Sequence, residues 1–207
     1  GYLTKGIHFA PANLSGFNVC QQASAGCALA CLNTSGRGGM EKTQESRIAK
    51  TVRFFRDRLP FLAQLGKEIE AAMREAKRRA LTFCARMNLT SDLPFEKIRD
   101  NNAQTIFERF PSVQFYDYTK IPSRMHAFLD GALPSNYHLT FSRSESNAKD
   151  VEKIMARGGN VAVVFRGGLP EKWQGIEVIN GDESDLRFLD KRGVVVGLVE
   201  KGLAKKD

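Results

Sequence analysis

Short apolar runs alternate with helical patterns along the second half of this 207-residue chain. The runs are rich in β-branched and aromatic residues, as strands are, and they span residues 81–88, 113–118, 137–142, 160–165, 176–180 and 194–198. Helical periodicity fills two of the gaps, at 102–110 and 147–158. A repeating strand, helix, strand order predicts a parallel sheet with helices packed outside it.

The first half of the chain adds one short strand and two helices. Residues 6–10 read GIHFA and predict a strand that ends in the turn-like sequence PANLSG. Two amphipathic helices follow from Glu41, with apolar faces at Ile48, Val52, Phe55 and Leu59 and, after Pro60, at Phe61, Leu65, Ile69 and Met73. Proline is tolerated in a first helical turn, so Pro60 is expected to begin the second helix.

These segments predict one α/β domain over residues 1–207. It comprises a cysteine-loop segment at 1–40, a helical segment at 41–80 and strand–helix repeats at 81–207. A complete eight-stranded (β/α) barrel usually needs ~250 residues. We therefore expect a partial or open (β/α) barrel with a parallel sheet of about six or seven strands, and with the cysteine loop after the first strand.

Three of the four cysteines lie close together in the sequence, at Cys20, Cys27 and Cys31. Their spacing, C-x6-C-x3-C, differs from the paired C-x2-C knuckles of structural zinc sites. Three local thiolates suit a [4Fe-4S] cluster whose fourth iron is held by another side chain, water or substrate. Zinc completed by histidine or aspartate, or no metal, are the alternatives. Cys84 lies within a predicted strand and is expected to be a small buried residue.

Polar clusters follow several of the predicted strands. Because the carboxyl ends of parallel strands share one edge, these clusters and the cysteine loop are expected to line one mouth. The predicted substrate-binding residues are Asn88, Asp92, Asp117, Lys120, Ser142 and Glu145. His138 or Asp117 could hold the fourth iron. The catalytic residues are not identifiable from the sequence.

The formal net charge of +8 permits a nucleic-acid partner, because basic surfaces concentrate polyanions. Much of the excess, however, lies in residues 74–79 and in the C-terminal tail, where a solvated face explains it. No apolar run approaches the length of a membrane span, and the first residues lack the apolar stretch of a signal peptide. The expectation is a cytoplasmic protein without a membrane partner.

Several segments together resemble a family found in phages and mobile elements. The segments, in chain order, are GIHFAPANLSGFNVCQQASAGCALACLNTSGRGG, RMNLTSDLPFE, FPSVQFYDYTK, NYHLTFSRSE and GGNVAVVF. They resemble the gene product 88 domain family across nearly the entire chain. The resemblance implies a phage origin and action in the cytoplasm of an infected bacterial host. It also implies that Cys20, Cys27 and Cys31 match the family's cysteine motif, whereas Cys84 does not.

A second, architectural resemblance is to the radical S-adenosylmethionine enzymes, whose partial barrels carry a three-cysteine [4Fe-4S] loop after the first strand. Their usual spacing is C-x3-C-x2-C, from which this chain departs. No convincing glycine-rich segment for the methionine moiety is present, so the resemblance gives S-adenosylmethionine only weak support as a cofactor. The sequence GRGG at 36–39 could cradle an anion, although paired glycines usually mark a loop.

Two classes of function follow from these features. In the first, an iron–sulfur cluster at the mouth of a partial barrel carries out redox or radical chemistry on an unknown substrate or with a redox partner. In the second, zinc fixes the N-terminal loop of a virion, replication or nucleic-acid-associated component. The elaborated strand ends favour the first class, because a structural metal needs no cavity beside it.

Overall fold

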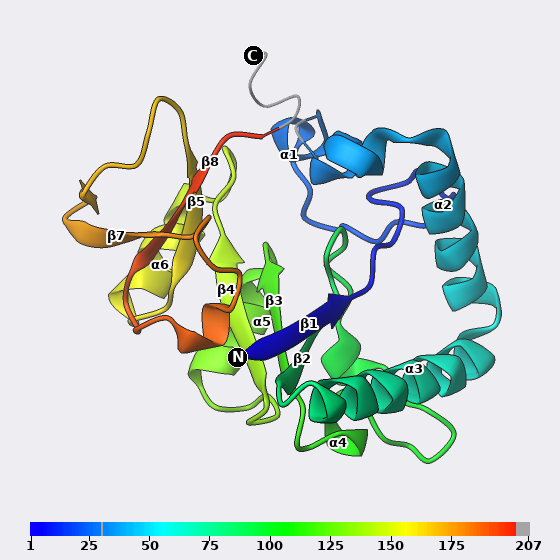
Figure 1. The fold of residues 1–207 in the computed structure, drawn as a ribbon. Helices are drawn as coiled ribbons and strands as arrows, with labels where there is room; N and C mark the ends of the chain where they lie inside the picture. Colours follow the sequence, from blue (N-terminus) through cyan, green and yellow to red (C-terminus); the bar gives the residue numbers. More distant parts are fainter. Residues whose placement is uncertain (30, 202–207) are drawn as a thin grey trace.

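The computed structural model describes residues 1–29 and 31–201. One open sheet organises the chain (Figure 1), and its strands, in spatial order, are β1 (Tyr2–Gly6), β2 (Thr82–Arg86), β3 (Gln114–Thr119), β4 (Tyr137–Ser142), β5 (Val161–Phe165), β8 (Val195–Val199), β7 (Ile176–Asn180) and β6 (Lys172–Trp173). All neighbouring strands pair in parallel except β6 and β7, which are antiparallel. The carboxyl ends of seven strands therefore point toward one edge.

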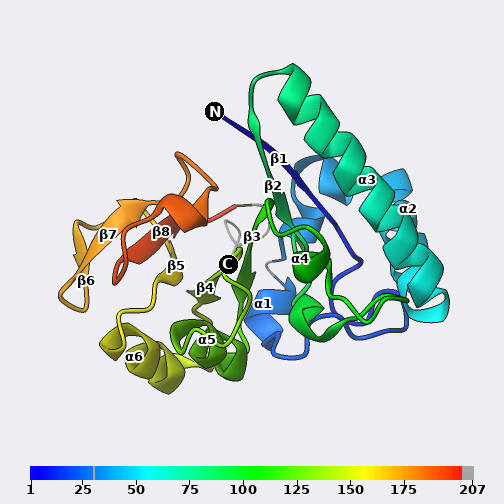
Figure 2. The same cartoon turned by 90° about the horizontal axis from the view of Figure 1, so that it is seen from below.

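The helices are α1 (Ala25–Leu29), α2 (Glu41–Arg56), α3 (Arg58–Arg78), α4 (Ile106–Arg109), α5 (Pro122–Leu129) and α6 (Ala148–Ala156). Four 3-10 turns join them, at η1 (Leu32–Thr34), η2 (Gly36–Gly39), η3 (Phe95–Lys97) and η4 (Arg187–Leu189). Helices α3, α5 and α6 pack on one side of the curved sheet, which we call the outer face (Figure 2). Turn η4 contacts β3 and β4 from the other side, the inner face.

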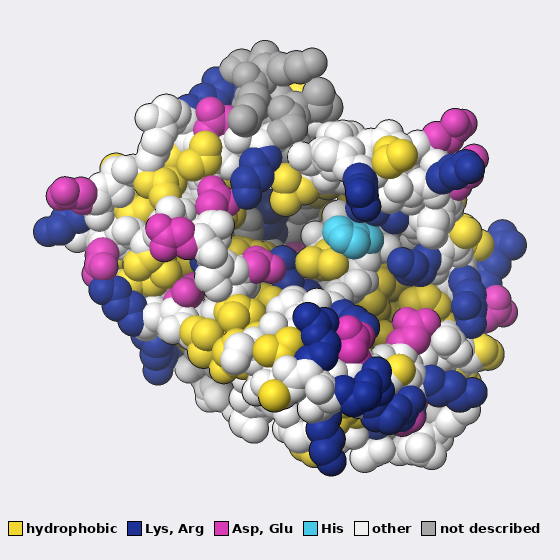
Figure 3. Space-filling view, in the orientation of Figure 1, with side chains coloured by type: hydrophobic (Ala, Val, Ile, Leu, Met, Phe, Trp, Pro, Cys, Tyr) yellow, Lys and Arg dark blue, Asp and Glu magenta, His cyan; other side chains and the backbone are white. Residues whose placement is uncertain are grey.

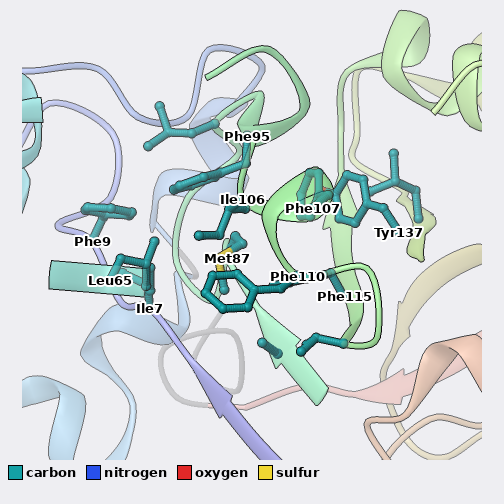
Figure 4. Packing of buried hydrophobic residues seen from close by; sticks show 14 of the residues in the cluster. Ile7, Phe9, Leu65, Met87, Phe95, Ile106, Phe107, Phe110, Phe115 and Tyr137 are labelled. Atoms are coloured by element: carbon teal, nitrogen blue, oxygen red, sulfur yellow. The ribbon is translucent and has the colours of Figure 1, made fainter. Parts of the chain in front are cut away.

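The hydrophobic core lies between the outer face and its helices. Helix α3 buries Leu62, Leu65 and Ile69 toward the sheet, because residues three and four apart share one helical face. Figure 4 shows this packing, in which Phe107 stacks on Tyr137 with ring centroids 4.1 Å apart. These buried side chains hold the strands in register and so fix the position of every strand end.

The inner face is polar where the outer face is apolar. On β2, Phe83 and Ala85 join the core, whereas Cys84 and Arg86 face inward, as strand alternation requires. The Arg86 guanidinium lies 4.9 Å from the ring centroid of Tyr118 and forms an ion pair of 2.7 Å with Asp185. Phe188 of η4 packs edge-on against Tyr116, with ring centroids 5.2 Å apart. The inner face can therefore accommodate charged and hydrogen-bonding groups.

The predicted α/β class with a mostly parallel sheet is confirmed. The predicted first strand is wrong in position, because β1 ends at Gly6 and the GIHFA segment continues beyond it. Four of the five β1 residues are exposed, so this strand has no apolar signature in the sequence. The sheet also contains the short strand β6, which the sequence did not predict.

Two helix boundaries differ from the predicted ones. Helix α3 begins at Arg58, two residues before Pro60, so the break between α2 and α3 falls at Asp57. Helix α4 has only four residues and starts at a capping box, in which Thr105 and Glu108 exchange hydrogen bonds. No helix among the described residues combines the length and the apolar character needed to cross a membrane.

Candidate functional site

The cysteine loop lies along the carboxyl edge of the sheet, and α1 sits beyond the arrowheads of β3 and β4 (Figure 1). Its first half is attached to the segment that follows β2. The Asp92 N–H donates to the Val19 carbonyl at 2.8 Å, and the Cys20 thiol lies 3.7 Å from the Thr90 carbonyl oxygen. The Thr90 hydroxyl donates to the Phe9 carbonyl at 2.6 Å. These hydrogen bonds therefore fix the position of Cys20 relative to the segment that follows β2.

A buried polar network holds the segment that follows β2 in place. Asn88 and Asp117 are both buried, and Asp117 accepts hydrogen bonds from the Asn88 N–H at 2.8 Å and the Tyr137 hydroxyl at 3.0 Å. The Asn88 side-chain oxygen in turn accepts from the Leu93 N–H at 2.8 Å. The turn after β2 is thereby tied to strands β3 and β4.

Arg124 connects the same turn to α5. Its side chain is 4% exposed, and the guanidinium forms an ion pair with Asp92 and makes two hydrogen bonds of 2.7 and 2.9 Å with Glu96. Asp92 also accepts from the Thr119 hydroxyl at 3.1 Å and from the Lys120 N–H at 2.8 Å. Because these partners are charged and buried, the network is sensitive to the loss of any one of them.

The next part of the loop is attached to the end of β4. Glu145 accepts hydrogen bonds from the Ser24 hydroxyl at 2.7 Å and from the Gly26 N–H at 2.9 Å. A Cβ at position 26 would lie 2.8 Å from Glu145 Oε1, so glycine permits this close approach. The Ser24 hydrogen bond, and more weakly the charge of Lys120, lower the pKa of Glu145. Lys120 itself donates to the Ser142 hydroxyl at 3.1 Å.

The last part of the loop is held by α2. The Asn33 amide donates to Gln44 Oε1 at 2.7 Å, Gln44 donates back to the Asn33 carbonyl at 2.8 Å, and the Arg47 guanidinium donates to the same carbonyl at 3.2 Å. A Cβ at Gly38 would lie 2.6 Å from this carbonyl. Gly38 therefore permits the close approach of η2 to η1 and to Arg47 of α2.

All three loop thiols are free and only partly exposed. The pKa of Cys20 is raised to about 11, mainly by burial. A backbone hydrogen bond from Ala12 opposes the rise, and the nearby Cys31, Asp92 and Cys27 contribute to it. Burial also raises the pKa of Cys31, with Lys120 and Arg47 acting in the opposite direction. Cys20 and Cys31 are therefore protonated at neutral pH when no metal is bound, which argues against a thiolate nucleophile.

The three sulfurs lie within electrostatic range of one another without forming a ready-made metal site. Cys20 is influenced by both other thiols, and Cys31 by Cys27. Within 1–29 and 31–201, however, no three side chains of the His, Cys, Asp or Glu type are arranged to hold a metal ion.

A comparison with protein families now identifies the chain. The model of the family described as Gene product 88 matches residues 1–207. This chain belongs to the gene product 88 family. Neither the curated proteins nor the solved structures contain a match. The resemblance of the sequence segments to this family is thus confirmed.

The six predicted substrate-binding residues of this gene product 88 chain lie toward the carboxyl ends of β2, β3 and β4 or just after them, on the side of the sheet that carries the cysteine loop. They form two groups. Asn88, Asp92 and Asp117 are buried and bonded within the protein. Lys120, Ser142 and Glu145 are partly or fully exposed near the loop. Contact of any of the six with a ligand stays a prediction.

The two side chains considered for the fourth iron do not lie beside the thiols. Asp117 is fully buried beneath the turn that follows β2. His138 lies near the amino end of β4, where it lines a cavity of about 390 Å³ with Phe128 and Phe188. A smaller cavity of about 220 Å³, which Lys77 and Leu81 help to line, also lies at the amino ends of the strands. Strand direction and register place both cavities at the edge opposite the cysteine loop.

His8 lies near the candidate site although the sequence analysis did not select it. The pKa of His8 is lowered to about 4 by burial and, in decreasing order, by the charges of Arg47, Lys50 and Arg86. Its Nδ1 atom is buried without a hydrogen-bond partner in the described structure. The sequence around a single histidine after an exposed strand does not predict this environment. The environment depends on α2, a helix about 40 residues further along the chain.

Cys84 lies away from the loop thiols and is fully buried. Its sulfur contacts the Thr4 hydroxyl at 3.2 Å and the Leu3 carbonyl at 3.8 Å. We expect Cys84→Ala to cost about 1–2 kcal/mol of unfolding free energy, as for a small buried side chain, and to leave the metal content unchanged. Denaturant titration and metal analysis of the variant test this. Loss of one metal equivalent would make Cys84 a ligand.

The pH dependence of stability should report the burial of Asp117. Burial raises its pKa from 3.8 to about 6, against the lowering effects of Arg86, Asn88, Arg124 and Tyr137. The Asp117 carboxyl group thus binds its proton more tightly in the folded state than in the unfolded state. Its contribution to the unfolding free energy is therefore fully present below about pH 4 and is lost as pH rises through about 6. Asp117→Asn cannot titrate.

The unfolding free energy of the wild type minus that of Asp117→Asn should therefore fall between pH 4 and pH 6 and stay level above pH 7. The fall is on the order of 2–3 kcal/mol, at about 1.36 kcal/mol per pKa unit. Urea titrations at four pH values measure it. A difference that stays constant from pH 4 to pH 8 would show that Asp117 titrates normally.

Proposed function

We propose that this gene product 88 chain binds a [4Fe-4S] cluster through Cys20, Cys27 and Cys31, at the mouth of a partial (β/α) barrel formed by the open sheet. The observation that carries the proposal is that three free, half-buried thiols lie on one loop, which is attached to the carboxyl edge of the sheet at Cys20 and Gly26 and to α2 at Asn33. When bound, such a cluster supplies one-electron transfer or activation of a substrate at an open iron.

The donor set suits this cofactor. Thiolates are soft ligands that favour iron–sulfur cores or zinc over magnesium or calcium. The Asn33 N–H lies 3.5 Å from Cys31 Sγ, and such hydrogen bonds to sulfur tune the potential of a cluster. Burial raises the pKa of Cys31, and Lys120 and Arg47 act against that rise, so positive charge lies near the place where thiolates would form.

Cluster binding requires the loop to draw the three sulfurs together. Helix α1 carries Cys27 and has only five residues, none of them buried, so little packing opposes its movement. Leu29 and Leu32 on either side of Cys31 are 59% and 57% exposed. A closed loop that shields these leucines would gain hydrophobic stabilisation.

The fourth iron has no cysteine available to it, because Cys84 is fully buried on β2. Such an iron would be open to a substrate, and we propose that Lys120, Ser142 and His8 would border that substrate at the mouth of the sheet. The inner face of the sheet, with its charged and aromatic side chains, would then form the wall of the substrate site.

Anaerobic reconstitution with iron and sulfide tests the proposal. The loaded protein should be brown, with broad absorption near ~400 nm as thiolate-ligated clusters show. Loop closure should also slow tryptic cleavage after Arg37, which is exposed in η2. A colourless protein whose cleavage at Arg37 is unchanged by iron and sulfide would contradict cluster binding.

A further inference from the structure

We propose that Arg86 binds the carboxylate of a small, partly apolar acid at the inner face of the sheet, and that Asp185 occupies the place of that carboxylate when the acid is absent. The acid would displace Asp185 and place its apolar body beside Phe188. The proposal rests on the assignment of the inner face to substrate. It does not depend on the cluster, since none of these residues is a proposed metal ligand.

Arg86 is a buried cation with an unused donor. Its side chain is 10% exposed, and its guanidinium lies 5.7 Å from the ring centroid of Tyr116 and 4.9 Å from that of Tyr118. Nη1 donates to Asp185 at 2.7 Å, whereas Nε is buried and has no hydrogen-bond partner in the described structure. Asp117, between the two tyrosines, faces the opposite side of β3. Because a guanidinium binds carboxylates through two parallel N–H groups, a free carboxylate can satisfy Arg86 more completely than Asp185 does.

Asp185 is an unusual partner for a buried arginine. It lies in the connection between β7 and β8, and its side chain is 49% exposed. Arg124, in contrast, is held by Asp92 and Glu96, whose side chains are only 11% and 4% exposed. The carboxylate on Arg86 therefore comes from the surface, and a dissolved carboxylate can compete with it.

The segment that carries Asp185, residues 184–190, is not paired with the sheet. Its backbone hydrogen bonds in the described structure join residues of the segment to one another. Its contacts with the inner face include the Asp185 ion pair and the ring of Phe188, which packs against Tyr2 and Tyr116 with centroids 5.4 and 5.2 Å away. Asp185 can therefore leave Arg86 without breaking the pairing of any strand.

The strand register places Arg86 in one row with two other inward-facing side chains. The β2–β3 pairing continues from Ala85 so that Arg86 is level with Tyr116, and Tyr116 is paired with His138 of β4. Adjacent strands lie about 4.8 Å apart, so the backbone positions of Arg86 and His138 are on the order of 10 Å apart. Both ends of the row carry a buried nitrogen without a partner among the described residues, Nε of Arg86 and Nε2 of His138. Buried polar atoms are normally hydrogen-bonded, so this row points to a ligand.

A cavity at the His138 end of this row offers space for an apolar body. Its volume is about 390 Å³, and its lining includes Phe128, Leu139 and Phe188. Its charged lining residues, Asp190 and Arg192, have opposite signs and add no net charge. Figure 3 shows this side of the molecule hollowed at its centre, where Figure 1 draws β3 and β4. A ligand can therefore approach the inner face from solvent.

Charge balance favours a carboxylate over a phosphate. Under the segment, Arg86 pairs with Asp185, and Arg187 lies 3.3 Å from Asp190. Replacing Asp185 by one carboxylate keeps the two charges of each sign. A phosphate dianion would add an unpaired negative charge to a largely buried region, which is costly.

Titration calorimetry of the metal-free full chain with phenylpropionate tests the site. Phenylpropionamide is the control ligand, because it has a similar shape and no charge. The wild type should bind the acid at least about tenfold more tightly than the amide, as expected for one charge-assisted interaction. Acid binding should also increase amide hydrogen exchange in residues 185–190, since Asp185 is displaced.

Asp185→Asn removes the internal competitor and should strengthen binding of the acid about tenfold. Glu183→Gln is the matched control, because Glu183 is an exposed acid of the same connection that is bonded to Asn180 rather than to Arg86. It should change the affinity less than about twofold, since an exposed charge is screened. In an Arg86→Gln background, Asp185→Asn should give no gain in affinity.

Melting temperatures provide a readout that also detects unfolding. Asp185→Asn leaves Arg86 unpaired, so it should melt below the wild type, and the acid should raise its melting temperature more than that of the wild type. Equal affinity of the wild type for the acid and the amide would overturn the proposal. So would absence of acid binding, or an equal gain from Glu183→Gln. These results are obtained without iron, so they are separate from the outcome for the cluster.

Discussion

Replacement of Arg124 by methionine is expected to destabilise the protein by about 3–5 kcal/mol, because it leaves buried carboxylates without their cation. Arg124 is 4% exposed and contacts Asp92, Glu96 and the Tyr137 hydroxyl. Methionine retains much of the side-chain volume, so the loss of unfolding free energy reflects the missing charge rather than a cavity. Chemical denaturation monitored by circular dichroism measures it.

Arg99→Met is the matched control for this prediction. Arg99 pairs with Glu108 at 3.2 Å, and both side chains are about half exposed. Exposed pairs contribute ~0–1 kcal/mol, so the control should stay within that range. If Arg124→Met also stays within it, the buried network does not hold the turn that follows β2.

The same substitution should loosen the cysteine loop. The Asp92 carboxylate accepts a hydrogen bond from the Arg124 guanidinium. The backbone N–H of Asp92 donates to the carbonyl of Val19, the residue before Cys20. Loss of Arg124 is therefore expected to increase hydrogen exchange in residues 18–24 more than in α2. Equal increases in both regions would indicate global destabilisation instead.

The second large effect concerns the thiols. Changing any one of Cys20, Cys27 or Cys31 to alanine should abolish cluster assembly, because two cysteines cannot hold a cubane that three hold together. The absorbance near ~400 nm should be lost in each variant. Cys84→Ala serves as the matched control, since it removes one thiol that is buried elsewhere.

The stability of the three variants distinguishes metal loss from unfolding. Each loop cysteine is partly exposed, so its replacement by alanine should change the melting temperature of the metal-free protein little. A cysteine whose alanine variant retains full colour is not a ligand. If the alanine variants of two of the three cysteines retain full colour, the proposal that three thiolates hold the cluster is wrong.

Much of the architecture followed from periodicity and from the chemistry of strand ends. The alternation of strand-like runs and helical patterns predicted the parallel sheet, and parallel strands place their carboxyl ends at one edge. The polar clusters after β2, β3 and β4 therefore came together beside the cysteine loop, as the hydrogen bonds of Asp92, Lys120 and Glu145 show.

Other features were beyond the reach of local sequence. Arg47 looks like one of many charged residues on an amphipathic helix, yet it is buried against Asn33. Asp117 looks like a polar strand end, yet it is enclosed by Asn88 and Tyr137. These environments depend on contacts between segments distant in the chain, which periodicity does not encode.

His138 illustrates the importance of register. The sequence analysis names it as a possible ligand at the mouth of the sheet, but it occupies the second position of β4. Ser142, the last residue of the same strand, is the one that reaches Lys120. Four residues along a strand span about 13 Å, enough to move a side chain from one edge of a sheet to the other.

Iron, sulfide and zinc analysis of the anaerobically purified and reconstituted protein, combined with Mössbauer spectroscopy, tests the central claim most directly. The three-thiolate site predicts about four irons and four sulfides per chain, the composition of one [4Fe-4S] cluster, with one iron whose spectrum differs from the other three because it lacks a cysteine. One zinc per chain without bound iron, and without sulfide, would contradict the account and favour a structural metal in the cysteine loop.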